Sequence, residues 1–152
     1  MDIRYQLKRF SDLTSTELYS IFRLRQAVFV VEQNCTYVDA DGLDQDAYHL
    51  SGYLDDNLVA YTRLIPPVVV YKEHSAITRV INAKHVRGKG VGRDLMKRSI
   101  QLCRMLWPEV SIKIGAQSYL QSFYESLDFV RSGDEYLEDG IPHIHMILDY
   151  KS

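Results

Sequence analysis

A glycine-rich segment between a predicted strand and a predicted helix constrains this chain more than any other feature. Residues 76–81 predict a strand, and the helix that opens near Val91 has an apolar side and a charged side. The segment between them ends in Arg87-Gly88-Lys89-Gly90-Val91-Gly92. Glycine lets the backbone turn tightly and approach a ligand closely, and free amides at a helix start attract phosphate. The segment therefore predicts a phosphate-binding turn.

The alternative for this segment is a tight turn without a ligand. Such a turn needs fewer glycines and no cluster of basic residues, whereas Arg87, Lys89 and Arg93 lie in or beside this one. Two other phosphate motifs do not match. The P-loop spacing that ends in Gly-Lys-Ser/Thr is missing, and so is Gly-x-Gly-x-x-Gly followed by an acidic residue on the next strand.

Composition places the chain among ordinary globular proteins. Its 152 residues suit one domain, 1–152, and 46% of them are hydrophobic, which is enough apolar surface for a core. A net charge of -2 gives no basic field to attract nucleic acid, and no apolar run has membrane-spanning length. Cys35 and Cys103 do not form a disulfide framework. We therefore expect a cytoplasmic protein with no nucleic-acid or membrane partner.

The remaining patterns predict an α/β fold. Thr14 and Glu17 form a capping box that opens a helix ending near residues 32–34. Ser118 and Gln121 form a second such signature, before a helix at 120–127. Strands are predicted at 3–8, 49–54, 58–65, 110–116, 129–130 and 141–148. The resulting order, β-α-β-β-β-α-β-α-β-β, predicts a mixed sheet covered by helices.

Two segments of the chain resemble the GNAT N-acetyltransferase superfamily in the correct order. The motif Arg87-x-x-Gly90-x-Gly92 resembles that family's pyrophosphate loop, Gln/Arg-x-x-Gly-x-Gly/Ala, and the segment 123–129 resembles its tyrosine-containing helix and the strand entry after it. Residues 25–35, 115–117 and 138–143 are similar to the ElaA group within that superfamily. The resemblance covers most of the chain.

The resemblance implies a mostly antiparallel central sheet with helices on both faces and a splayed parallel strand pair, 76–81 and 110–116. Acetyl-coenzyme A would bind between these two strands as co-substrate. Backbone groups of Val80 and Ile81 would hold its pantetheine arm and polarise the thioester. Amides of the glycine loop would hold the pyrophosphate, and Gln117 would contribute as well. The coenzyme site implied by the resemblance consists of Val80, Ile81, Arg87, Gly88, Lys89, Gly90, Val91, Gly92, Gln117 and Tyr124.

Acyl transfer to an amine requires a neutral amine and a protonated leaving thiolate. The spacing of Tyr124 alone favours a core aromatic, whereas the resemblance makes it the acid. The base stays open, with Glu32, Asp41, Asp44 and His49 as candidates. Two positions depart from the family pattern, because Gln117 stands where Asn is frequent and Asp128 where Gly is frequent.

Several of these residues could have purely structural roles instead of catalytic ones. Arg25 falls on an apolar helix stripe and needs a partner if buried, so Glu32 could simply pair with it. His49 could be a packed, hydrogen-bonded histidine. His143 and His145 share one strand face, but no third ligand is evident, and we predict no metal.

Two other functions stay open. Six residues faintly resemble acyl-homoserine lactone synthases: Arg25, Phe29, Glu32, Asp41, Asp44 and Arg63. A non-catalytic acyl-coenzyme A-binding module is the second. For the enzyme we expect a small-molecule or peptide amine as acceptor, weakly favour a cationic one because of the aspartates at 39–46, and expect a monomer or homodimer.

Overall fold

The computed structural model describes residues 1–152 and has one eight-stranded sheet. The strand order is β1-β2-β3-β4-β5-β8-β6, and β7 pairs with β8 beside this path. The strands are β1 Arg4–Arg9, β2 Tyr48–Leu54, β3 Asn57–Ile65, β4 Ser75–Asn82, β5 Ile112–Gln117, β6 Val130–Arg131, β7 Tyr136–Glu138 and β8 Ile141–Leu148. Every pair is antiparallel except β4 and β5, in agreement with the mostly antiparallel sheet that the resemblance implied.

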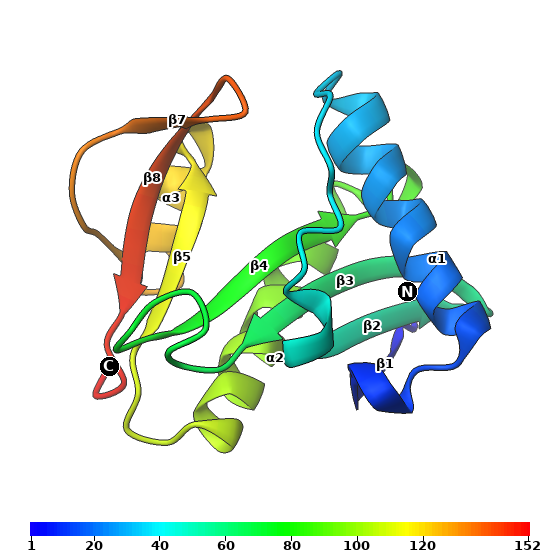
Figure 1. Ribbon diagram of the computed structural model, residues 1–152, viewed down its shortest axis with the longest axis horizontal. Helices are drawn as coiled ribbons and strands as arrows, with labels where there is room; N and C mark the ends of the chain where they lie inside the picture. The colour runs from blue at the N-terminus through cyan, green and yellow to red at the C-terminus, as the bar shows by residue number, and fades with distance from the viewer.

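Helices cover both faces of the sheet (Figure 1). The helices are α1 Ser15–Arg25, the π-helical η2 Gln26–Glu32 that continues it, α2 Val91–Leu106 and α3 Gln121–Glu125; short 3₁₀ turns are η1 Phe10–Asp12, η3 Asp44–Asp46, η4 Lys84–Val86 and η5 Ser118–Leu120. Ile21 of α1 packs with Tyr61 of β3. On the other face, Ser99 of α2 is hydrogen-bonded to Thr62 at 2.8 Å. Successive residues of a strand point to opposite faces, so β3 is sandwiched between the two helices.

The parallel pair β4–β5 separates soon after it begins. Its register contains only Ser75 opposite Ile112 and Ala76 opposite Lys113. Beyond these pairs the two strands diverge, and β5 turns away with β8 at its side (Figure 1). The edge of β4 from Ile77 onward therefore has no strand partner on that side. This confirms the splayed parallel pair that the resemblance implied.

Local signals explain much of this framework. The Thr14 capping box is confirmed, with Glu17 N donating to Thr14 Oγ1 at 3.1 Å and Thr14 N donating to Glu17 Oε1 at 2.8 Å. The turns of the β2–β3 and β7–β8 hairpins contain left-handed residues: Asp55 and Asp56 at φ 53° and 80° in the first, and Asp139 and Gly140 at 52° and 77° in the second.

The second capping box is wrong. A 3₁₀ turn, Ser118–Leu120, precedes the five-residue α3, so Ser118 is not at the helix N-cap position. Its buried hydroxyl oxygen has no hydrogen-bond partner. The short strand β7 was not predicted, because its three residues Tyr136–Glu138 are too few for an alternating pattern. None of the helices is long and apolar enough to cross a membrane.

Candidate active site

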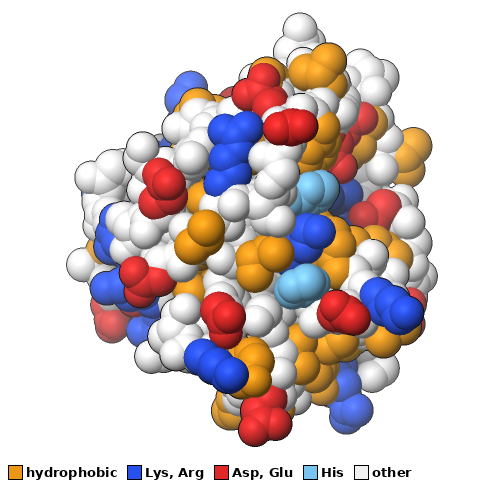
Figure 2. Space-filling model, turned by 90° about the vertical axis from the view of Figure 1, so that its left-hand side faces the viewer, with side chains coloured by type: hydrophobic (Ala, Val, Ile, Leu, Met, Phe, Trp, Pro, Cys, Tyr) orange, Lys and Arg blue, Asp and Glu red, His pale blue; other side chains and the backbone are white.

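A cleft of about 780 Å³ lies where β4 and β5 separate. One wall is formed by β4, η2 and the loop after η2, and the other by β5, α3 and the β7–β8 hairpin. At the rim the Cys35 thiol donates to the Asp139 backbone carbonyl at 3.3 Å, which ties the two walls together. On the side of the molecule that carries β8, hydrophobic side chains and charges of both signs are interspersed, with two histidine side chains near the middle (Figure 2).

A β-bulge shapes the β4 wall of the cleft. Tyr61 of β3 pairs with Ile81 and Arg63 pairs with Thr78, so Arg79 and Val80 together lie opposite Thr62. Arg79 adopts φ 55°, a left-handed value that occurs in one class of bulge and that non-glycine residues rarely adopt. The bulge redirects the backbone groups of Val80 and Ile81, and both residues line the cleft.

The predicted glycine loop lies at the start of α2. Gly88 and Gly90 adopt φ 77° and 80°, and a Cβ atom at either position would meet nothing within 4 Å. Gly90 is the N-cap of α2 and supplies no side-chain cap, so the first amides of the helix have no side-chain partner there. The Val91 side chain is buried in the core. The loop therefore presents backbone amides to open space.

The last glycine of the motif has a different role. A Cβ atom at Gly92 would lie 2.8 Å from Nδ2 of Asn82, so any other residue here would force the Asn82 side chain to move. Gly92 and Arg87 line the cleft, while Lys89 is exposed. These contacts fix the loop against the unpaired part of β4.

Arg87 is held by Glu32 across the cleft wall. Its Nη1 lies 2.5 Å from Glu32 Oε2, its Nη2 lies 3.1 Å from Oε1, and its Nε donates to the Asn82 carbonyl at 3.1 Å. The hydrogen bonds from Arg87 lower the pKa of Glu32. Glu32 thus lies beside the glycine loop, and the alternative of a Glu32–Arg25 pair is wrong.

Arg25 instead belongs to a buried network of three arginines and three aspartates, which we call the arginine–aspartate network: Arg25, Arg63, Arg79, Asp39, Asp41 and Asp44. Arg25 has no exposed surface, and its Nε and Nη1 lie 2.6 Å from Asp39 and 2.5 Å from Asp44. Arg63 pairs with Asp41 at 2.8 Å and Asp44 at 3.0 Å. Arg79 pairs with Asp39 at 2.7 Å.

The network balances its own charge. Burial raises the pKa of Asp41 and Asp44. Hydrogen bonds and positive charge from the arginines, joined at Asp41 by the Leu43 amide, together outweigh burial, so the pKa of each carboxyl falls below its ordinary value. Both carboxylates are ionised and neutralised at pH 7. The three aspartates of the network therefore offer no surplus negative charge, and Asp46, the fourth of this loop, is exposed and does not line the cleft. The argument for a cationic acceptor that rested on these aspartates is lost.

His49 does not line the cleft. It is 1% exposed, its Nε2 lies 2.9 Å from the Asp44 carbonyl, and its Nδ1 lies 2.6 Å from the Tyr61 hydroxyl. Because a carbonyl only accepts, Nε2 carries the proton and Nδ1 accepts from the hydroxyl. Burial lowers the pKa of the ring. His49 is therefore the packed, hydrogen-bonded histidine of the structural alternative.

Tyr124 and Gln117 lie on the opposite wall, both lining the cleft. Tyr124 is 5% exposed and packs edge-on against the rings of Phe123 and Phe129. Burial, and secondarily the neighbouring Tyr119, raises the pKa of Tyr124 to about 12. The phenol is therefore neutral at pH 7 and carries a proton that it can give. Asp128 adopts φ 73°, the conformation for which the family pattern has glycine.

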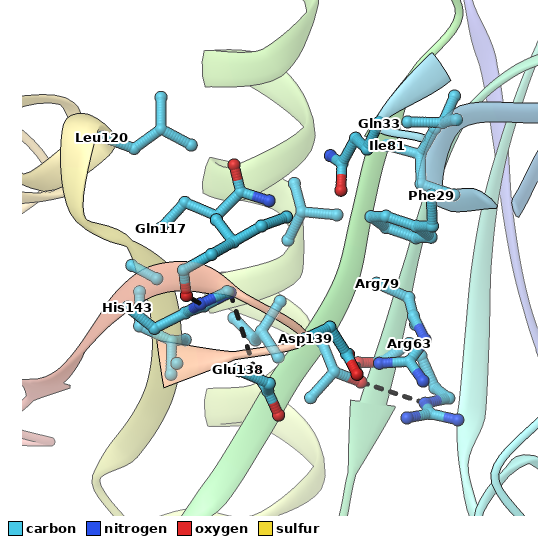
Figure 3. Close-up of a pocket in the computed structure, with 18 of the residues that line it drawn as sticks. Phe29, Gln33, Arg63, Arg79, Ile81, Gln117, Leu120, Glu138, Asp139 and His143 are labelled. Atoms are coloured by element: carbon cyan, nitrogen blue, oxygen red, sulfur yellow. Dashed lines mark hydrogen bonds and ion pairs between the residues drawn. The ribbon is translucent and has the colours of Figure 1, made fainter. Parts of the chain in front are cut away.

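A row of side chains that the sequence did not bring together lies beside Gln117. In the sheet register, Gln117 of β5 is opposite His143 of β8, and His143 is opposite Tyr136 of β7. All three line the cleft together with His145, and Figure 3 shows Gln117 and His143 on one side of the opening with Ile81 and Phe29 on the other. The alternation at 143–146 predicted one shared face for the histidines, but only the sheet order places that face in the cleft.

Comparison with known proteins gives consistent matches. The family model for the acetyltransferase (GNAT) domain matches residues 26–150. Protein ElaA of Escherichia coli is 43% identical over 152 residues, covering 95% of each chain, and a Synechocystis protein is 43% identical over 149 residues, covering 97% of this chain and 96% of its own.

Solved structures agree with these sequence matches. A crystal structure described as an acyl-CoA N-acyltransferase from Pseudomonas aeruginosa superposes with a TM-score of 0.92 at 41% identity, covering 96% of this chain and 99% of that one. Escherichia coli ElaA gives 0.90 at 42% identity with the same coverage.

Proposed function

The chain belongs to the GNAT acetyltransferase family, and within it we propose an acetyl-coenzyme A-dependent N-acetyltransferase that moves the acetyl group directly to an amine. The observation that carries this proposal is the separation of β4 from β5 after two residue pairs. An unpaired strand edge can accept an extended ligand as an added strand. The edge of β4 from Ile77 onward offers that surface to the pantetheine arm, with Val80 and Ile81 at its bulge.

The glycine loop is proposed to hold the pyrophosphate. Its left-handed glycines leave open space where side chains would otherwise project, and the amides at the start of α2 favour an anion there. Gly88, Gly90 and Gly92 shape the backbone, while Lys89 and Arg87 supply positive charge beside it. The residues present thus fit a diphosphate.

Tyr124 is proposed to protonate the leaving thiolate. A thiol has an ordinary pKa of about 8.5, below the raised pKa of about 12 for Tyr124, so the phenol stays protonated until the thiolate forms nearby. Gln117, at the end of β5, is proposed to help hold the thioester end of the substrate. No structural observation favours the acyl-homoserine lactone synthase alternative.

Thermal melting tests the proposal directly. At a hundredfold excess over its dissociation constant, a ligand adds about 2.7 kcal/mol to stability, which for a chain of this size raises Tm by about 5–10 °C. Acetyl-coenzyme A is expected to give this shift, while NAD and ATP at the same concentration give less. Equal shifts from all three, or none from acetyl-coenzyme A, would reject the coenzyme site. Release of free thiol with a panel of primary amines then separates an enzyme from a binding module.

A further inference from the structure

We propose that His143 is the general base that takes a proton from the attacking amine, an inference that rests on the proposed function. The four candidates predicted from the sequence lack a free proton-accepting group. Glu32 is paired with Arg87, Asp41 and Asp44 are paired with arginines, and both ring nitrogens of buried His49 are hydrogen-bonded. A base in this cleft must come from elsewhere.

The backbone fixes the tautomer of His143. Its Nδ1 lies 2.7 Å from the backbone carbonyl of Ile141, which can only accept, so Nδ1 carries the proton of the neutral ring. Nε2 therefore keeps its lone pair. The ring lines the cleft with 11% of the side chain exposed, and its cross-strand neighbour is Gln117 at the end of β5. A lone pair held in place beside the proposed thioester position is what a general base requires.

Neighbouring groups hold this ring in place. The Tyr136 ring stacks on His143 at 5.8 Å and on His145 at 4.6 Å between centroids. Room for Tyr136 exists because residue 115 is glycine, since a Cβ atom there would lie 2.7 Å from the tyrosine hydroxyl. Glu138 Oε2 is 3.6 Å from His143 Nε2 and its side chain is 60% exposed, so it can stabilise an imidazolium and remains in contact with water.

His145 is a poorer base than its neighbour on the same strand face. Burial lowers its pKa first, and the positive charge of Lys113 lowers it further. Tyr71 packs edge-on against the His145 ring, and Lys113 lies over Tyr71. The charged and titratable groups around the two histidines are thus Glu138 and Tyr136 from β7, Lys113 from β5, and Tyr71 from the segment before β4. The only carboxylate among them, Glu138, lies 3.6 Å from His143 Nε2, and at His145 it offsets only part of the lowering of the pKa.

In the proposed step, His143 Nε2 takes one proton from the ammonium group, the neutral amine attacks the thioester carbon, and a C–N bond forms. The adduct then breaks its C–S bond, and the departing thiolate takes the Tyr124 proton. The nitrogen loses its second proton to water, Tyr124 regains one from water, and His143 releases its own past Glu138. The net products are an amide, a free thiol and one proton.

His143→Gln tests this role when the acceptor varies in basicity. With a primary alkylamine, which has a pKa of about 10.4, kcat is expected to fall by about 100-fold or more, and the rise of rate with pH should move toward the pKa of the amine itself. With hydroxylamine, whose nitrogen is already neutral at pH 7, the loss should be less than about tenfold. His145→Gln removes the same ring from the same strand face and should keep the wild-type pH profile. Equal losses with both nucleophiles, or an unchanged profile in His143→Gln, would overturn the proposal.

A second measurement tests the proposal even if His143→Gln does not fold. In wild-type protein with ¹⁵N-labelled histidine, the His143 resonances of the neutral ring should show the Nδ1–H tautomer with Nε2 unprotonated; an Nε2–H tautomer would overturn the proposal. Failure of this inference is distinguishable from failure of the proposed function. If His143 is not the base, wild-type protein still binds acetyl-coenzyme A and transfers acetyl groups, and any loss in His143→Gln does not depend on the basicity of the acceptor. If the proposed function is wrong, wild-type protein itself shows no stabilisation by acetyl-coenzyme A.

Discussion

The glycine loop, residues 87–92, and the arginine–aspartate network flank one cleft but are held in opposite ways. The loop depends on local backbone conformation, with left-handed glycines and only a few side-chain contacts. The network depends on side chains from α1, β3, β4 and the loop after η2, and Arg25, Arg63, Asp39 and Asp44 are at most 5% exposed. A loop of the first kind can be recognised from consecutive residues, whereas a network of the second kind exists only once distant segments have met.

Gly90→Glu tests whether the glycine loop binds the pyrophosphate. A side chain at φ 80° costs about 1–2 kcal/mol, and a carboxylate in the open space would repel a diphosphate. We expect calorimetry to show at least a hundredfold loss of affinity for acetyl-coenzyme A, or about 2.7 kcal/mol. Gly133→Glu is the matched control, because Gly133 has φ 100° and open space but lies far from the loop in sequence. Retained affinity in Gly90→Glu would refute the placement of the pyrophosphate.

The corresponding change in the network is Arg25→Met. It leaves Asp39 and Asp44 with fewer partners, and removing one member of a buried ion pair costs about 3–5 kcal/mol. Chemical denaturation should show this loss, while the folded variant should still be stabilised by acetyl-coenzyme A. Arg98→Met breaks an exposed pair with Asp94 and should cost less than about 1 kcal/mol. Similar losses of stability in both variants would mean that burial of the network contributes nothing to the free energy of unfolding.

The sequence predicted most of what local patterns can encode. The strand, glycine loop and amphipathic helix at 75–106 follow from consecutive residues, and so does the Thr14 capping box. The predicted helix start at Ser118 was wrong because the Ser-x-x-Gln spacing there belongs to a 3₁₀ turn and not to a helix N-terminus. Four aspartates at 39–46 are equivalent in sequence, so nothing local could tell that Asp39 and Asp44 become buried partners of Arg25. His143 faces the cleft only because β8 pairs with β5.

Tyr124→Phe separates the rate of acetyl transfer from the affinity for acetyl-coenzyme A, on the cleft wall opposite the network. Losing the phenolic proton should lower kcat by about 10²–10⁴ fold, because general acids contribute in that range, while the affinity for acetyl-coenzyme A stays within about threefold. Thiol-release kinetics and calorimetry measure the two quantities. Tyr119→Phe, an exposed tyrosine of the same segment, should retain most of the activity. Unchanged turnover in Tyr124→Phe would remove this residue from the mechanism.

The smallest expected effect comes from Glu32→Gln, which cuts the connection between the loop and the other side of the cleft. The Glu32–Arg87 pair is more than a third exposed on both sides, so it contributes less than about 1 kcal/mol to stability. Losing the carboxylate removes a negative charge beside the proposed phosphate site and frees Arg87 to face it. We expect the affinity for acetyl-coenzyme A to rise by about two- to fivefold at low salt and this gain to shrink as salt screens it. Turnover should fall by less than about tenfold. A loss of about 100-fold in kcat with unchanged affinity would instead make Glu32 the base and displace His143.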